Sequence, residues 1–166
     1  MITGNPEAIA NTHPFASLLL ELNREEFVAP LIEAISKGVP GESGYLSDYL
    51  YALHGLLEGQ ESLLKVEDHF VHSLGGWLLS TGGGEISWKS GLLLGEIENR
   101  STREYLLKGS LDSSLLHLTR VACLRAIVNH YGEDASEILE KLVDDEDSDV
   151  REAALDAKKF VDGRSK

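Results

Sequence analysis

The stretch DEDSDVREAALDAKKFV (residues 145–161) decides the fold, because it joins an acidic turn to a helix with a small inward face. Ala153, Ala154 and Ala157 recur at the three- and four-residue spacing of one helix face. The distance between packed helices depends on the side chains at their contact, so a face of methyl groups allows close approach. The stretch therefore predicts a helix that lies tightly against a neighbouring helix.

The same pattern occurs twice more upstream, with one constant interval between copies. Each copy has a small residue, a leucine and a second small residue at alternate positions. The copies are Gly91, Leu93 and Gly95; Ala122, Leu124 and Ala126; and Ala153, Leu155 and Ala157. A shorter helix is expected between copies, over 101–110 and again over 134–143. A period in the thirties built from two helices is typical of an α-solenoid, because one helix pair cannot bury both of its apolar faces alone.

Apolar residues at helical spacing continue through the rest of the chain, and no period-2 strand stands out. An N-terminal helical segment is expected over 5–22, and Asn23 is a suitable cap for a helix that Pro30 should bend and Gly38 should end. Further helices are expected over 45–58, 61–79, 86–97, 101–110, 114–131, 134–144 and 148–162. Gly75 and Gly76 should weaken the second of these.

We therefore predict one all-α domain over 1–166, a right-handed α-solenoid of about four helix pairs (24–58, 61–97, 101–131 and 134–162).

The sequence also resembles a known family. Val150-Arg151 with Ala153-Ala154, and the segment 94–97 (LGEI), are similar to the short HEAT repeats of phycobilisome-lyase-like proteins. The resemblance is good over 86–162, weaker over 24–80, and uncertain in register near 101–131, where Leu118-Thr119 precedes Arg120. It implies HEAT-like pairs, with the second helix of each pair lining the binding surface. HEAT-like di-iron hydroxylases use His-Glu dipeptides as ligands, and none occurs here.

Composition limits the partners. The 166 residues carry a formal net charge of −13, which disfavours binding to nucleic acid and to anionic membranes. The acidity either keeps the protein in solution or steers a basic partner toward it. No apolar run reaches the length of a membrane span, the N-terminus has no signal-peptide pattern, and a single cysteine fits a reducing compartment. We expect a cytoplasmic protein.

The acids concentrate between residues 133 and 152, where ten acids and two bases give a net charge of −8. Asp134, and either Asp147 or Ser148, are expected to cap helices, which leaves the other acids in excess. These form either a solvated end face or a docking patch for a basic protein. The candidate partner-binding residues are Asp144, Asp145, Glu146, Asp149, Glu152 and Asp156, with Trp88 as an aromatic anchor.

Arg120 and Arg151 occupy one column of the repeat, behind acidic turns. In HEAT repeats such an arginine commonly pairs with a turn aspartate of its own or a neighbouring repeat. The resemblance therefore implies a structural role for both arginines, against the alternative of ligand contact.

The sequence contains no recognisable catalytic or cofactor motif. His69 and His72 share a helix face beside Asp68 but lack a clear third ligand, so we expect no metal. The glycines at 82–84 lack the spacing of a phosphate-binding loop. Cys123 lies on the small-residue face, which favours an inert packing role.

We expect no cofactor and no catalytic activity. The leading hypothesis is a protein-binding module, most specifically a small acidic inhibitor such as an immunity protein neutralising a basic bacterial toxin. The alternatives are a bilin lyase subunit or chaperone, as the resemblance implies, and a HEAT-like DNA-repair glycosylase, which the charge disfavours. Oligomeric state is left open.

Overall fold

The computed structural model describes residues 25–41, 45–80, 84–132 and 135–164, and shows a mostly helical, all-α chain. This coarse class agrees with the prediction. The helices are α3 (Val28–Ser36), α4 (Leu46–Leu57), α5 (Asp68–Leu78), α6 (Gly84–Leu94), α7 (Thr102–Leu111), α8 (His117–His130), α9 (Ala135–Leu142) and α10 (Ser148–Arg164). A 3-10 turn, η1 (Glu25–Phe27), precedes α3, and the expected segment 5–22 and the Asn23 cap lie outside the described residues.

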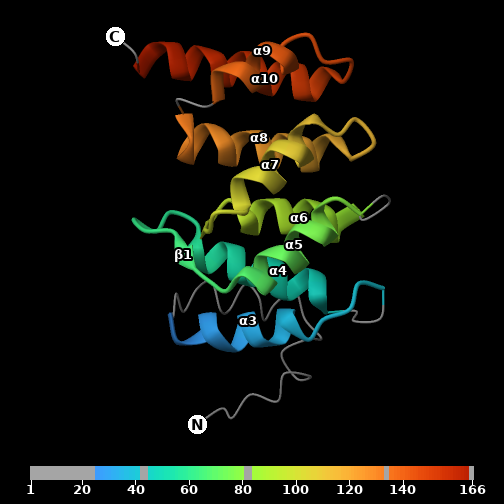
Figure 1. Cartoon of the computed structure of the whole chain (residues 1–166), viewed down its shortest axis with the longest axis vertical. Helices are drawn as coiled ribbons and strands as arrows, with labels where there is room; N and C mark the ends of the chain where they lie inside the picture. The colour runs from blue at the N-terminus through green and yellow to red at the C-terminus, as the bar shows by residue number, and fades with distance from the viewer. Residues whose placement is uncertain (1–24, 42–44, 81–83, 133–134, 165–166) are drawn as a thin grey trace.

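Neighbouring helices pack as pairs, α3 on α4, α5 on α6, α7 on α8, and α9 on α10. The second members also touch in succession, α4 on α6, α6 on α8, and α8 on α10, while α5 touches α7 and α7 touches α9. Figure 1 shows the result as layers across the long axis, with α3 at one end and α9 and α10 at the other. One cluster of buried apolar side chains includes residues from all of these helices.

Small residues set the distance between α6 and α8. A Cβ atom placed on Gly95 would lie 2.9 Å from the Cβ of Ala126, and one on Gly91 would lie 3.3 Å from the Sγ of Cys123. The first distance is too short for two carbon atoms that are not bonded, so the two helices are as close at this point as their side chains allow. The matching leucines, Leu93 and Leu124, are fully buried.

The leucine of the third copy, Leu155 on α10, has different surroundings from the leucines of the first two copies. Leu155 is 45% exposed, although Leu93 and Leu124 at the same spacing are 0% exposed. Among the described helices, α6 packs on α4, α5 and α8, and α8 packs on α6, α7 and α10, whereas α10 packs mainly on α8 and α9.

The connection between α4 and α5 differs from the expectation of a helix over 61–79. The α-helix begins only at Asp68, and β1 (Leu64–Lys65) pairs in parallel with β2 (Ile97–Glu98), with Leu64 opposite Ile97. The expectation that the chain has no strand was therefore wrong for these four residues. Pairing between segments that are distant in the chain is not visible in a local apolar period, which is why the sequence did not reveal it.

Pro30 lies in a different part of its helix from the one expected, and the cost of the glycine pair stays a prediction. Because α3 starts at Val28, Pro30 falls in its first turn, where a missing N–H costs no helical hydrogen bond, so no kink is required. Gly75 and Gly76 lie inside an uninterrupted α5. Gly75 is buried because the ring of Tyr105 occupies the space a side chain would take, 2.4 Å from its Cβ position.

Other helix boundaries agree within about three residues, which is the precision expected of boundaries predicted from sequence. The largest of these differences are three residues, at the start of α8 (His117 rather than 114) and at the end of α6, which stops at Leu94 rather than 97 because Ile97 belongs to β2. No helix in the described ranges has both the length and the apolar character needed to cross a membrane.

Candidate functional site

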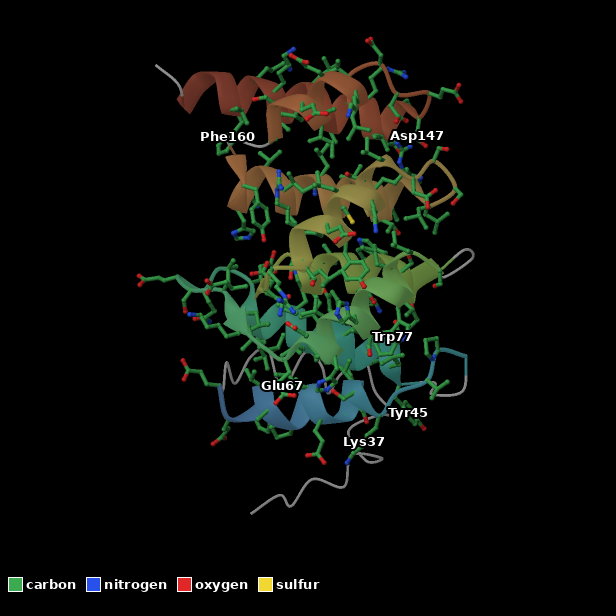
Figure 2. The ribbon with its side chains drawn as sticks, in the orientation of Figure 1. Lys37, Tyr45, Glu67, Trp77, Asp147 and Phe160 are labelled. Carbon is green, nitrogen blue, oxygen red and sulfur yellow. The ribbon has the colours of Figure 1, made fainter. Side chains whose placement is uncertain are left out.

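The acidic turn before α10 is built mainly to start that helix. The carboxylate of Asp147 accepts hydrogen bonds from the backbone N–H groups of Asp149 and Val150, at 2.9 and 3.2 Å. This is the expected cap, since it satisfies donors that have no partner within the helix. Figure 2 shows Asp147 at one end of α10, with Phe160 toward the other end.

Asp145 in the same turn is bound by Arg120 of α8. Both oxygens of the carboxylate accept from the guanidinium, the Nη1–Oδ1 distance being 2.9 Å, and Nη2 donates to Oδ2. Arg120 is only 4% exposed, and its Nε donates to the carbonyl oxygen of Ser110 at 3.2 Å. The hydrogen bonds from Arg120 hold the pKa of Asp145 below its usual value. Arg120 therefore joins α7 and α8 to the turn before α10, and the carboxylate of Asp145 is already occupied.

Arg151 braces the turn through the backbone. Its Nη1 donates to the carbonyl oxygen of Asp145 at 2.6 Å. One repeat period before Arg120 stands Lys89, which is also buried and donates to the hydroxyl of Ser47 at 2.7 Å. Lys89 lies 5.4 Å from the centre of the Tyr51 ring, a cation–π distance. The column therefore has a third basic member that sequence reasoning missed, and the repeat spacing alone would have found it.

The remaining acids of the predicted patch differ in their surroundings. Asp149 lies 3.4 Å from the His117 ring, and Asp156 pairs with Lys159 at 2.8 Å. Asp144, Glu146 and Glu152 are exposed. The structure therefore gathers Asp144, Glu146 and Asp149 around one turn.

Trp88 belongs to a different feature, a groove of about 290 Å³ between α6 and α8 that reaches the end of α4. Trp88, Leu92 and Glu96 line one wall at a spacing of four residues, and α8 forms the other wall. The groove lies on the second helices of three pairs, the face on which the sequence predicted binding. Among the described residues, its lining includes none of the acids of the turn.

The two ends of the groove differ in polarity. Trp88, Leu92, Leu118 and Val121 line the apolar part. The polar end is formed where the C-termini of α4, α6 and α8 meet, and its lining groups are His54, Glu58, Glu96, Asn129 and His130. Helix C-termini carry partial negative charge from carbonyl groups, which adds to the effect of the carboxylates.

Glu96 is the least compensated charge in the groove. Burial raises its pKa, and the nearby Glu58 raises it further. Among the described residues, the basic group within ion-pair range is His54, with Nε2 3.9 Å from the carboxylate Oε1. Burial lowers the pKa of His54, so this imidazole is neutral at pH 7 and does not balance the charge. Arg125 also lines the groove, but its side chain is exposed to solvent.

The backbone on both sides fixes this end of the groove. The carbonyl oxygen of Glu96 accepts from the N–H of Leu64 at 2.8 Å, next to the β1–β2 pairing. Glu58 follows the last turn of α4, and Gly59 then adopts a φ of +78°, which lets the chain turn away. The backbone that carries each of the two acids is therefore fixed by hydrogen bonds.

The other side chains considered from the sequence have local partners. Asp68 accepts from Asn99 and from Arg100, each at 2.8 Å, and His72 hydrogen-bonds the Tyr105 hydroxyl at 2.9 Å. Within the residues that the structure describes, no three histidine, cysteine or acidic side chains gather in a geometry for a metal ion. Burial raises the pKa of Cys123 to about 12, so its thiol stays protonated at neutral pH.

Sequence reasoning did not single out His54, Glu58 or Glu96. They come from two elements that are distant in the chain, and only packing brings them together.

Comparison with known proteins adds no relative to this description. No protein-family model matches the chain, and no curated protein or solved structure is significantly similar to it.

Proposed function

We propose that this chain is a non-enzymatic protein-binding module, a right-handed HEAT-like α-solenoid that takes a basic protein segment on the face of its second helices. Its most specific form is a small inhibitor that neutralises a basic protein such as a bacterial toxin, as an immunity protein does. The succession of helix pairs supports the solenoid part of the proposal.

One observation carries the binding proposal. The groove between α6 and α8 holds a half-buried carboxylate, Glu96, that lacks a positive counterpart in the described chain. Removing a charge from water is costly unless a partner compensates for it. A basic partner would supply that compensation, and the net charge of −13 would steer it toward the protein.

The groove volume of about 290 Å³ lies at the lower end of the range of small-molecule sites, roughly 300–1,000 Å³. Such a volume suits one or two side chains of a protein partner better than a large chromophore.

The test is affinity capture from the cells that carry the gene, at several salt concentrations, followed by co-expression with the captured protein. We expect a basic protein whose binding weakens with salt and whose toxicity this chain relieves. A capture that recovers no protein at any salt concentration, or only acidic ones, would contradict the proposal. The adjacent gene is the first candidate to co-express.

A further inference from the structure

We infer that the groove is a receptor for an arginine side chain, in which Glu58 and Glu96 hold the guanidinium and Trp88 holds a neighbouring apolar side chain of the same segment. This inference rests on the proposed function and names the residue class that the partner must present.

The polar end of the groove selects a cation. Glu58 and Glu96 line it together, Glu96 has a side chain that is 20% exposed, and the nearest imidazole is neutral. The C-terminal ends of three helices meet at the same place, and their carbonyl groups favour positive charge. Two carboxylates from different elements match the planar fork of a guanidinium, which can donate to both, better than they match the single point charge of a lysine.

The rest of the groove selects an apolar neighbour. Trp88 lies on α6, and Glu96 lies eight residues later, in the turn that follows Leu94; at the helical rise of 1.5 Å per residue this separation is about 12 Å. An extended peptide covers that length in about four residues. The groove is too small for a helix, whose diameter with side chains is roughly 10–12 Å. The matching segment is therefore extended, with an apolar residue and an arginine four positions apart.

The positive charge of Arg125 repels a bound arginine only weakly. It lies on the α8 wall but is exposed, and water screens an exposed charge far more than a half-buried one. Removing its charge should leave binding of the arginine unchanged or make it tighter. Removing the charge of Glu96 should instead weaken binding of the arginine.

The protein has two tryptophans, Trp77 on α5 and Trp88 in the groove, so NMR gives an internal control. The full chain, labelled with nitrogen-15, is titrated with the capped peptide Leu-Gly-Ser-Gly-Arg. We expect the indole N–H signal of Trp88 to shift in a saturable way while that of Trp77 does not move. The same peptide with citrulline, the neutral isostere, in place of arginine should give no such shift, and a lysine peptide should bind more weakly.

Protein variants separate the groove from the acidic turn. Glu96→Gln should weaken peptide binding about tenfold, which is ~1.4 kcal/mol. Its melting temperature should be equal to or above that of the wild type, because a poorly compensated carboxylate is removed. Glu140→Gln, an exposed acid on α9, is the matched control for net charge and should leave the dissociation constant unchanged.

The double variant Asp144→Asn with Glu146→Gln tests the alternative surface. If it weakens binding while Glu96→Gln does not, the arginine receptor is wrong but a basic partner on this protein remains supported. If the peptide leaves the Trp88 signal unmoved up to about 10 mM, far beyond the weakest affinities of specific sites, the inference is also wrong. The proposed function then depends on the capture experiment alone.

Discussion

Arg120 and Asp145, one on α8 and the other in the turn before α10, form a two-bond ion pair that ties these elements together. The arginine side chain is 4% exposed and the aspartate side chain 14% exposed. Such a pair is costly to form, because both charges leave water, and costly to break, because one charge is then left alone. It specifies how the last helix pair docks on the one before it.

Replacing Arg120 by alanine should lower the free energy of unfolding by about 2–4 kcal/mol, since Asp145 and the Ser110 carbonyl both lose their donor. Urea denaturation followed by circular dichroism measures the change. Arg100→Ala is the control, because the Arg100–Asp68 pair is exposed and should contribute less than about 1 kcal/mol. Equal effects of the two substitutions would contradict a special role for the buried pair.

The same pair should give stability a defined pH dependence. The pKa of Asp145 is lowered in the folded chain from its ordinary value of 3.8, so its contribution is complete above that value and is lost as the pH falls through the folded pKa. The stability difference between wild type and Asp145→Asn should therefore be constant from about pH 5 to 8 and shrink at lower pH. Thermal melts of both proteins across pH 3–8 measure it, and a difference that grows on acidification would refute it.

Gly75 and Gly76 are neighbours with opposite expected effects. A Cβ on Gly75 would lie 2.4 Å from the Tyr105 ring, whereas one on Gly76 would meet nothing within 4 Å. Gly75→Ala should destabilise the protein by about 1–3 kcal/mol through overpacking. Gly76→Ala should stabilise it by up to about 1 kcal/mol, because alanine is the better helix former. Denaturant midpoints of the two variants against wild type decide the signs, and a Gly75→Ala variant at least as stable as the wild type would show that Tyr105 of α7 is not held against Gly75.

Cys123 should be unreactive in the native protein. Its side chain is 0% exposed, it lies against Gly91 and Gly109, and burial raises its pKa to about 12. Alkylation requires the thiolate, so labelling should follow unfolding rather than pH. We expect modification by iodoacetamide, followed by mass spectrometry, to be slow in buffer and fast in denaturing urea. Rapid labelling without denaturant would show that α6, α7 and α8 separate readily around this residue.

The sequence was informative where the determinant is local or periodic. Helix periodicity predicted most helix positions, the acidic turn predicted the Asp147 cap, and the small-residue column predicted the close approach at Gly95 and Ala126. Lys89 was missed only because lysine was not compared with arginine in the same column. Its burial follows from contact with Ser47 and Tyr51 of α4.

The groove could not be predicted in the same way. Glu58 and Glu96 are ordinary acids in their own segments, and only packing between elements that are distant in sequence brings them together and raises the pKa of Glu96. The β1–β2 pairing that fixes Glu96 is likewise non-local and only two residues long. Pro30 was misjudged for a simpler reason, because its effect depends on where α3 begins.

Leu155 has a consequence for protein engineering. It is exposed on α10, whereas Leu93 and Leu124 at the same spacing are buried on α6 and α8, each of which packs against a second helix of the pair before it or after it. A designed helix pair could be fused after α10, with its own leucine and small residues one repeat period further on. It would meet a helix that already exposes an apolar side chain. The number of layers, rather than the core of any one of them, is the property of this molecule that a designer can change most freely.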